Sequence, residues 1–99
     1  MLKKKPNNRI IMDEEVQKKL VGKISHYYSK IGVAVVDLSD SLEVGDEISI
    51  EGVATNIRQT VDSMQVEHDN IQKAKKGESI GMKVVDKVRE NDQVFKIIQ

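Results

Sequence analysis

Two histidines are the side chains of this sequence best suited to acid–base or metal chemistry. His68 has a carboxylate on either side, Glu67 and Asp69, whereas His26 has none adjacent to it. In an extended segment, neighbouring side chains point to opposite faces, so Glu67 and Asp69 point away from His68. A metal ion needs ligands that converge on one point. The pattern therefore predicts no metal site.

Thiol chemistry and the common catalytic motifs are absent from the sequence. There is no cysteine, which excludes disulfide bonds, thiolate nucleophiles and zinc–sulfur sites. No G-x-x-x-x-G-K-[ST], G-x-G-x-x-G, G-x-S-x-G or H-E-x-x-H pattern occurs. Asp37 follows an apolar run, and we expect it at a strand end that turns to solvent. The sequence thus predicts a protein that is not an enzyme, with no cofactor and no small-molecule substrate.

Lysines are the residues whose charge could neutralise a phosphate backbone. The candidates for RNA binding are Lys73, Lys75, Lys76, Lys83, Lys3, Lys4 and Lys5. A formal net charge of zero and only three aromatic residues argue against a general nucleic-acid binder. RNA binding through these lysines is one hypothesis, and solvated turns without a ligand are the alternative.

Charge is distributed unevenly along the chain. Residues 1–30 hold eight Lys or Arg and three acids, a net charge of +5, whereas residues 31–57 hold six acids and no base. The remainder has eight bases and seven acids. This asymmetry predicts one acidic end and one or two basic patches.

Short apolar segments with strand-like alternation follow one another from about Val16 onwards. They cover residues 21–25, 31–38, 47–52, 57–66, 79–84 and 94–98. The apolar positions change phase between Val61 and Met64, which indicates a β-bulge or a strand that turns a corner. Six or so strands with no long helix predict an all-β domain, either an antiparallel sandwich or a small closed barrel.

The N-terminal residues differ from the rest in composition. Residues 3–8 lack periodicity and contain the only proline, Pro6, so we expect a flexible basic arm over residues 1–14 and a single domain over residues 15–99. No apolar run approaches the roughly 20 residues that span a bilayer. The basic residues near the N-terminus are not followed by the apolar region of a signal peptide. These features predict a cytoplasmic protein with no membrane partner.

Four motifs occur in the order found in a known family. They are 32–37 (GVAVVD), 42–48 (LEVGDEI), 61–65 (VDSMQ) and 74–81 (AKKGESIG). The series resembles the second domain of translational GTPases of the elongation factor Tu type, and it extends over roughly Val21 to Ile98. The resemblance implies a small closed six-stranded antiparallel Greek-key β-barrel of the translation-factor domain 2 type. It also suggests a stand-alone translation elongation factor-like protein without GTPase activity.

Five residues of these motifs have the types that tight turns and close approaches require. They are Gly32, Gly45, Asp46, Gly77 and Gly81. In the resembled family, the domain also contacts the acceptor end of aminoacyl-tRNA. The corresponding positions here are Gln65, Glu67, His68 and Ser79. They depart from the family pattern, because Glu67 adds a charge that repels phosphate and Gln65 replaces an acid.

Two functions remain open. The first is an RNA- or ribosome-associated module that binds through the lysines named above, and the resemblance favours it. The second is a protein-interaction or accessory barrel that docks on an enzyme, through the acidic residues 37–51 or a sheet edge. A barrel similar to this one is appended to some collagenase-like peptidases of the U32 type.

Overall fold

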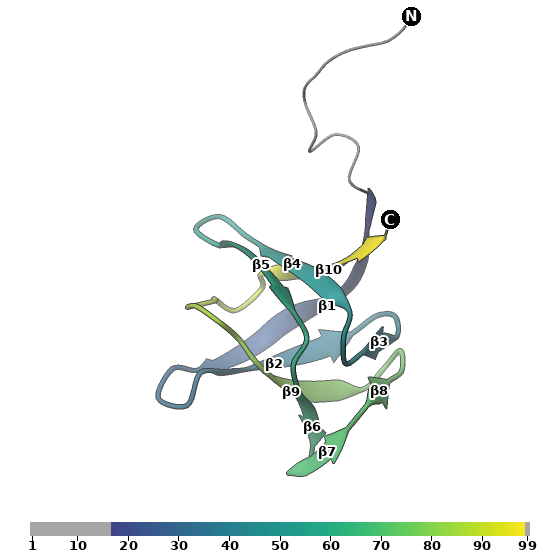
Figure 1. The fold of residues 1–99 in the computed structure, drawn as a ribbon. Coiled ribbons are helices and arrows are strands. Elements are labelled where there is room, and N and C mark those ends of the chain that lie inside the picture. The colour runs from purple at the N-terminus through teal and green to yellow at the C-terminus, as the bar shows by residue number, and fades with distance from the viewer. Residues whose placement is uncertain (1–16, 99) are drawn as a thin grey trace, which may run out of the picture.

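The computed structural model describes residues 17–98 of the chain, and within this range it consists of strands and turns (Figure 1). The arm predicted for residues 1–14 lies outside the described residues. Over residues 17–98 there is no helix of the length and apolarity needed to cross a membrane. The strands are β1 (Gln17–Tyr28), β2 (Val33–Leu38), β3 (Leu42–Glu43), β4 (Glu47–Glu51), β5 (Asn56–Thr60), β6 (Met64–Val66), β7 (Asp69–Ile71), β8 (Lys73–Ala74), β9 (Ser79–Lys83) and β10 (Gln93–Ile98).

Eight strands form one antiparallel sheet in the order β5-β4-β10-β1-β2-β9-β6-β7, and β3 pairs with β8 separately. The all-β class predicted from the sequence is confirmed. The closed six-stranded barrel is wrong, because the edge strands β5 and β7 are not hydrogen-bonded to each other. Short strands of two or three residues, such as β6 and β8, are too brief to complete a continuous ladder around the molecule.

The long strand β1 joins the two halves of the sheet. Its first part pairs with β10 and its second part with β2, and the register shifts between Leu20 and Gly22 and again between Ile24 and His26. Such bulges increase the local twist of a strand. The sheet therefore curls, and its two halves lie on opposite sides of one core (Figure 1).

The core is aliphatic, as a chain with three aromatic residues requires. Its buried side chains come from both halves of the sheet, from the β3–β8 pair and from connecting segments: Val21, Ile24, Ala34, Val36, Leu38, Leu42, Ile48, Ile50, Val61, Met64, Ala74, Ile80, Met82, Val84, Val88 and Val94. Alternation along the strands accounts for pairs such as Ile48 and Ile50, which both point inward. Burial of each such side chain contributes about 1.5–3 kcal/mol before the entropy of ordering it is subtracted.

A buried glutamine side chain connects the edge strand β5 to the segment after β9. Gln59 Nε2 donates to the carbonyl oxygen of Lys83 at 3.0 Å, and its Oε1 accepts from the N–H of Val85 at 2.9 Å. Only 8% of Gln59 is exposed. A side-chain amide thus makes two of the bonds that a main-chain ladder would make in a closed barrel, which explains how the open sheet remains compact.

Candidate functional site

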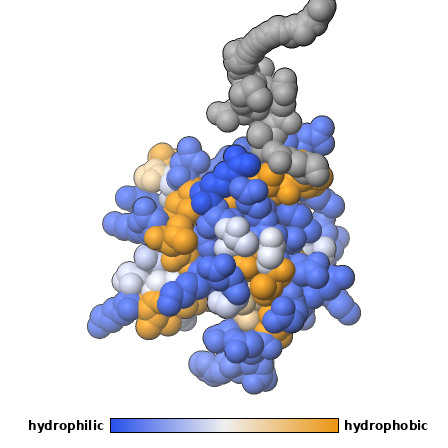
Figure 2. Space-filling model, viewed as in Figure 1, coloured by the Kyte–Doolittle hydropathy of each residue, from blue (hydrophilic) through white to orange (hydrophobic). Residues whose placement is uncertain are grey.

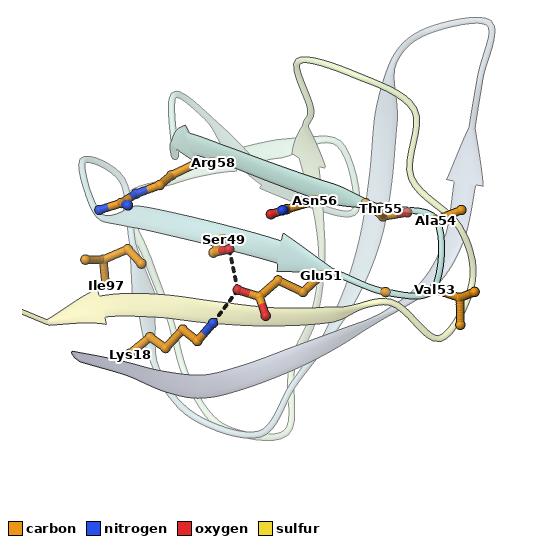
Figure 3. Close-up of a pocket in the computed structure, with 10 residues that line it drawn as sticks. Lys18, Ser49, Glu51, Val53, Ala54, Thr55, Asn56, Arg58 and Ile97 are labelled. Carbon is orange, nitrogen blue, oxygen red and sulfur yellow. Dashed lines mark hydrogen bonds and ion pairs between the residues drawn. The ribbon is translucent and has the colours of Figure 1, made fainter. Parts of the chain in front are cut away.

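A hollow of about 740 Å³ lies over the β4–β5 hairpin and the adjoining ends of β1 and β10 (Figure 3). Lys18 of β1, Ile97 of β10 and Ser49 of β4 line it, together with Arg58 of β5 and the hairpin residues 51–56. These side chains share the outer face of the sheet, because the ladder pairs Lys18 with Ile97 and Ser49 with Arg58.

Glu51 is the centre of the polar contacts in this hollow. Its Oε2 accepts from Lys18 Nζ at 2.5 Å and from Ser49 Oγ at 2.7 Å (Figure 3). The bond from Lys18, followed by that from Ser49, holds the pKa of the Glu51 carboxyl below its usual range. Glu51 is therefore ionised at neutral pH and already partnered, which is the behaviour of a structural ion pair.

Apolar surface adjoins these charges. The Lys18 ammonium lies 5.0 Å from the centroid of the Phe95 ring, a cation–π distance. Val53, at the tip of the hairpin, is fully exposed. The hollow thus combines satisfied charges with apolar surface, a composition suited to contact with a polypeptide.

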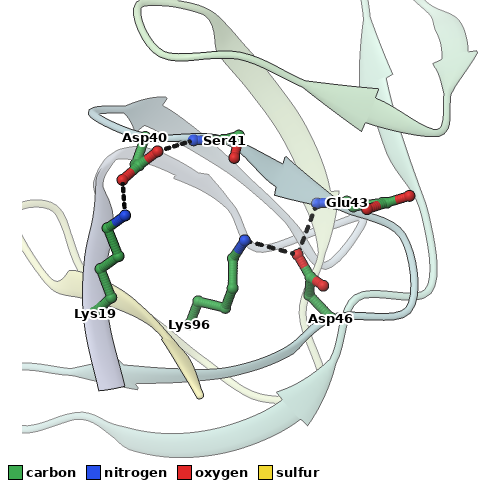
Figure 4. Close-up of polar contacts among 6 residues, drawn as sticks. All are labelled: Lys19, Asp40, Ser41, Glu43, Asp46 and Lys96. Carbon is green, nitrogen blue, oxygen red and sulfur yellow. Dashed lines mark hydrogen bonds and ion pairs between the residues drawn. The ribbon is translucent and has the colours of Figure 1, made fainter. Parts of the chain in front are cut away.

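Most of the acids in residues 31–57 form ion pairs with cations of other strands. Asp40 contacts Lys19 of β1 at 2.6 Å, and Asp46 contacts Lys96 of β10 at 3.5 Å (Figure 4). Arg58 pairs with Glu47 at 3.0 Å. With the Lys18–Glu51 pair, four of the six acids in residues 31–57 have a cationic partner. The predicted acidic end is therefore largely neutralised within the fold, and docking through residues 37–51 stays a prediction.

Asp40 and Asp46 also accept hydrogen bonds from the backbone. The N–H of Ser41 donates to Asp40 Oδ1 at 2.7 Å, and the N–H of Glu43 donates to Asp46 Oδ2 at 2.9 Å (Figure 4). The bond from Lys19, followed by that from Ser41, lowers the pKa of Asp40. These contacts fix the turns that precede and follow β3.

Among the described residues, the predicted RNA-binding lysines lie in two separate places. Lys73 lies in β8 opposite Glu43, and Lys75 and Lys76 lie in the turn between β8 and β9. Lys83 is at the other end of β9, a strand that extends over roughly 13 Å from Ser79. The lysines of the N-terminal run, Lys3, Lys4 and Lys5, lie outside the described residues. RNA binding by this set stays a prediction without geometric support.

Three of the five predicted turn residues have a left-handed backbone. Gly32, Gly45 and Gly77 have φ values of 67°, 100° and 92°, and side chains are disfavoured there. Asp46 follows Gly45 and binds back to the N–H of Glu43. Gly81 differs from the others, because it lies inside β9 and not in a turn.

The two histidines do not form a shared site. His26 lies on β1 with Nδ1 3.5 Å from Glu90, and its ring contacts that of Tyr28 edge-on. His68 and Glu67 have positive φ and form the tight turn between β6 and β7, so the extended conformation assumed for them is wrong. Over residues 17–98, no group of three or more His, Cys, Asp or Glu side chains could hold a metal ion.

Two glycines that the sequence analysis did not single out are required by contacts. A Cβ on Gly22 would lie 2.8 Å from Val36 Cγ1 and 2.9 Å from the carbonyl oxygen of Asp37. A Cβ on Gly52 would overlap the carboxylate of the buried Asp92. In both cases the contacting residue is distant in sequence, so no local pattern could have identified the glycine.

No family model matches the chain, but curated proteins do. A protein of Methanocaldococcus jannaschii named "Uncharacterized protease" is 40% identical over 76 residues, which are 76% of this chain and 19% of that protein. Two proteins of Porphyromonas gingivalis named "Collagenase" are each 40% identical over 82 residues. These residues are 81% of this chain and 23% or 20% of the collagenases. The chain therefore spans about a fifth of the length of these relatives.

Solved structures show the same fold. The C-terminal domain of a putative U32 peptidase from Geobacillus thermoleovorans superposes with a TM-score of 0.75 at 20% identity, covering 79% of this chain and 91% of that domain. Its selenomethionine variant gives a TM-score of 0.74 at 19% identity, covering 77% of this chain and 96% of that domain. The likeness to these structures is one of fold, over a single domain of the peptidase.

Two predictions are corrected by these comparisons. The chain is not a translation elongation factor-like protein, because its relatives are named as a protease and collagenases and its fold is that of a U32 peptidase domain. The short motifs that suggested the translation factors describe turns and strands, which unrelated functions share. The prediction of a protein that is not an enzyme is also contradicted, because the relatives carry the names of enzymes.

Proposed function

We propose that this chain serves a U32-type peptidase as an accessory domain that contacts the remainder of the peptidase. The observation that carries the proposal is the 40% identity to a protease and to collagenases over most of this chain. Since the matched region is about a fifth of those proteins, a domain of this kind acts beside a much larger partner.

The surface of the described residues suits contact with a polypeptide. The sheet has two open edges, at β5 and β7, and exposed backbone edges accept an additional strand. Exposed hydrophobic side chains lie at the tips of two hairpins: Ile31 between β1 and β2, and Val53 between β4 and β5. Polar networks such as that of Glu51 keep the hollow beside β4 in a defined shape.

A domain exchange tests the proposal. In the Porphyromonas gingivalis collagenase, the 82 residues that match this chain are deleted or replaced by the corresponding residues of this chain. We expect the deletion to lower the rate of collagen hydrolysis, and we expect the exchanged domain to restore at least half of it. A control exchange inserts an unrelated β-domain of the same length. If this chain restores no more activity than the control domain, the proposal is wrong.

A further inference from the structure

The outer face of the second half of the sheet carries a row of neighbouring side chains. The ladder places Tyr28 of β1 opposite Val33 of β2, and Val33 opposite Lys83 of β9. Beyond this row, the N–H of Val84 donates to the carbonyl oxygen of Gly32 at 2.9 Å. Ile31 precedes Gly32 and Val85 follows Val84, so both residues flank this hydrogen bond at the border of the row.

This group of exposed apolar residues is concentrated at one end of the molecule. Tyr28 is 49% exposed, Ile31 61% and Val85 67%. They are three of the six large hydrophobic residues that are exposed in the described range. We call Tyr28, Ile31, Val33 and Val85 the hairpin patch, after the β1–β2 hairpin that carries three of them. On the face shown in Figure 2, hydrophilic surface predominates and the hydrophobic areas are separated by polar ones.

A shallow hollow of about 350 Å³ adjoins the hairpin patch. Ile31, Val33, Gly81 and Lys83 line it, with Ser63 and Gln65 from the far side. Its floor is open at Gly81, which has no side chain.

The fold does not require a glycine at position 81. Gly81 pairs with Val35 and with Gln65 in unshifted register, and its φ is not in the left-handed region. An added Cβ would meet Val33 Cγ1 at 3.5 Å and the carbonyl oxygen of Gln65 at 3.8 Å, both ordinary contacts. A glycine inside a strand weakens it, and such a residue often marks the close approach of another group. Since no group of the described residues approaches the added Cβ more closely than 3.5 Å, a group that fits above Gly81 would come from outside these residues.

Charge indicates the chemistry of that group. Lys83 borders the hollow, and Lys30 lines a second apolar recess formed with Tyr27, Tyr28 and Ile31. No carboxylate lines either recess. Among the described residues, neither lysine is within ion-pair distance of an acid. The hairpin patch is thus an apolar surface with unneutralised positive charge at its border, which is complementary to an apolar side chain flanked by carboxylates.

We propose that the hairpin patch and the hollow over Gly81 bind an acidic segment of the peptidase, which inserts an apolar side chain above Gly81. This inference rests on the proposed function, since that function supplies the partner. It goes beyond it by naming the surface, the charge of the partner segment and the role of Gly81.

Binding in trans tests the inference with purified proteins. The probe is the Porphyromonas gingivalis collagenase from which the 82 matching residues have been deleted, and calorimetry or surface plasmon resonance measures its dissociation constant with this chain. We expect Gly81→Val, which fills the hollow, to weaken binding at least tenfold. Its thermal midpoint should be unchanged or higher, because valine suits a strand. We expect Lys83→Glu to weaken binding tenfold at low salt, with a smaller effect at 0.5 M NaCl.

Leu20→Ser is the matched control, because it removes an exposed apolar side chain from the other half of the sheet, where β1 pairs with β10. It should leave the dissociation constant within twofold, whereas Ile31→Ser should raise it at least fivefold. If the wild-type chain binds the truncated collagenase and Gly81→Val binds equally well, the inference is overturned while the proposed function stands. If the wild-type chain does not bind, and the domain exchange also fails, both are overturned.

Discussion

At the scale of single residues, the contact between Gly52 and Asp92 joins the β4–β5 hairpin to the turn before β10. Asp92 is 5% exposed, and its Oδ2 accepts from the N–H of Arg89 at 2.8 Å. Its other oxygen lies where a Cβ on residue 52 would be. The absence of a side chain at Gly52 therefore allows a buried carboxylate to cap this turn.

Replacing Gly52 with alanine should destabilise the fold. The new Cβ displaces the Asp92 carboxylate and breaks its bond to Arg89, and loss of a buried hydrogen bond to a charged group costs about 1–3 kcal/mol. Urea unfolding measures the difference. In an Asp92→Ala background, which removes the obstructing carboxylate, the same glycine substitution should cost less than half as much. Equal costs in the two backgrounds would show that Asp92 is not the reason for the glycine.

Acid should weaken the fold through Asp40 and Glu51. Both carboxyls have a pKa below the usual range in the folded chain, since Lys19 and Lys18 bond to them. A depressed folded pKa stabilises the fold above the unfolded pKa, which is about 4, and this stabilisation is lost as the pH falls through the lower folded value. We expect the free energy of unfolding to be constant from pH 7 to 5 and to fall below pH 4.

Glu51→Gln isolates one part of this pH dependence. The Lys18–Glu51 pair is partly exposed, so its contribution is at most about 1 kcal/mol. We expect the variant to lose this amount at pH 7 and to differ little from wild type at pH 2.5. A difference that is as large at pH 2.5 as at pH 7 would assign the loss to packing and not to charge. Asp62→Asn is the control, because it removes an exposed carboxylate that is not part of the Lys18–Glu51 pair. Gln93→Glu would not serve, because Gln93 lies opposite Glu51 and the change adds a charge beside the pair.

At the scale of elements, the open edge of β5 depends on Gln59. Its side chain satisfies the carbonyl oxygen of Lys83 and the N–H of Val85. We expect Gln59→Leu to lower the free energy of unfolding by about 2 kcal/mol, because two backbone groups lose their partner. Amide hydrogen exchange at Val85 should become faster in the variant. Gln65→Leu is the control, since Gln65 is exposed and bonds only to Asn70 among described side chains, and its effect should be below about 0.5 kcal/mol.

The bend of β1 depends on the absence of a side chain at Gly22, just as the β4–β5 hairpin depends on its absence at Gly52. An added Cβ would lie 2.9 Å from the carbonyl oxygen of Asp37, a backbone atom that cannot move without disturbing the β1–β2 ladder. Gly22→Ala should therefore cost about 1–3 kcal/mol, measured by denaturant unfolding. Gly81→Ala, in a strand with ordinary contacts, provides the comparison and should be neutral or stabilising. A neutral Gly22→Ala would contradict the contact.

Much of the element pattern is predictable from the chain, because the signals are local. Alternation identifies the strands around Ile48 and Ile50, and the phase change after Val61 marks the break between β5 and β6. The open sheet and the roles of Gly52 and Gln59 are not predictable in this way. Their partners lie tens of residues away, at Asp92 and Lys83. Short motifs also recur in unrelated proteins, which is why a series of turn glycines suggested the wrong family.

At the scale of the whole molecule, folding depends on contacts between distant parts of the chain. β1 pairs with β10, and cations of β1 and β10 pair with acids of the segment 31–57. Such topologies fold slowly because long loops must close before the contacts form. Within the described residues, folding places cations of β1, β5 and β10 beside four of the six acids of residues 31–57.

Refolding of the chain should occur in milliseconds to seconds, as measured by stopped-flow fluorescence of Tyr27 and Tyr28. The only proline is Pro6, which precedes every described strand, so we expect no phase with the time constant of tens of seconds that proline isomerisation produces. A Pro6→Ala variant should refold with the same kinetics. A large slow phase that disappears in this variant would show that residues before β1 take part in the folding step.

The pairing of Gln17 with Ile98 at the edge of the β1–β10 ladder has a consequence for protein engineering. Directly opposed residues on antiparallel strands have Cα atoms about 5 Å apart, so a short glycine linker could join them without disturbing the sheet. New termini could then be opened at the exposed tip beside Val53. Such a circular permutant should keep the fold. Because Gln17 and Ile98 lie side by side, the β-domain should also tolerate insertion into a surface loop of a host protein.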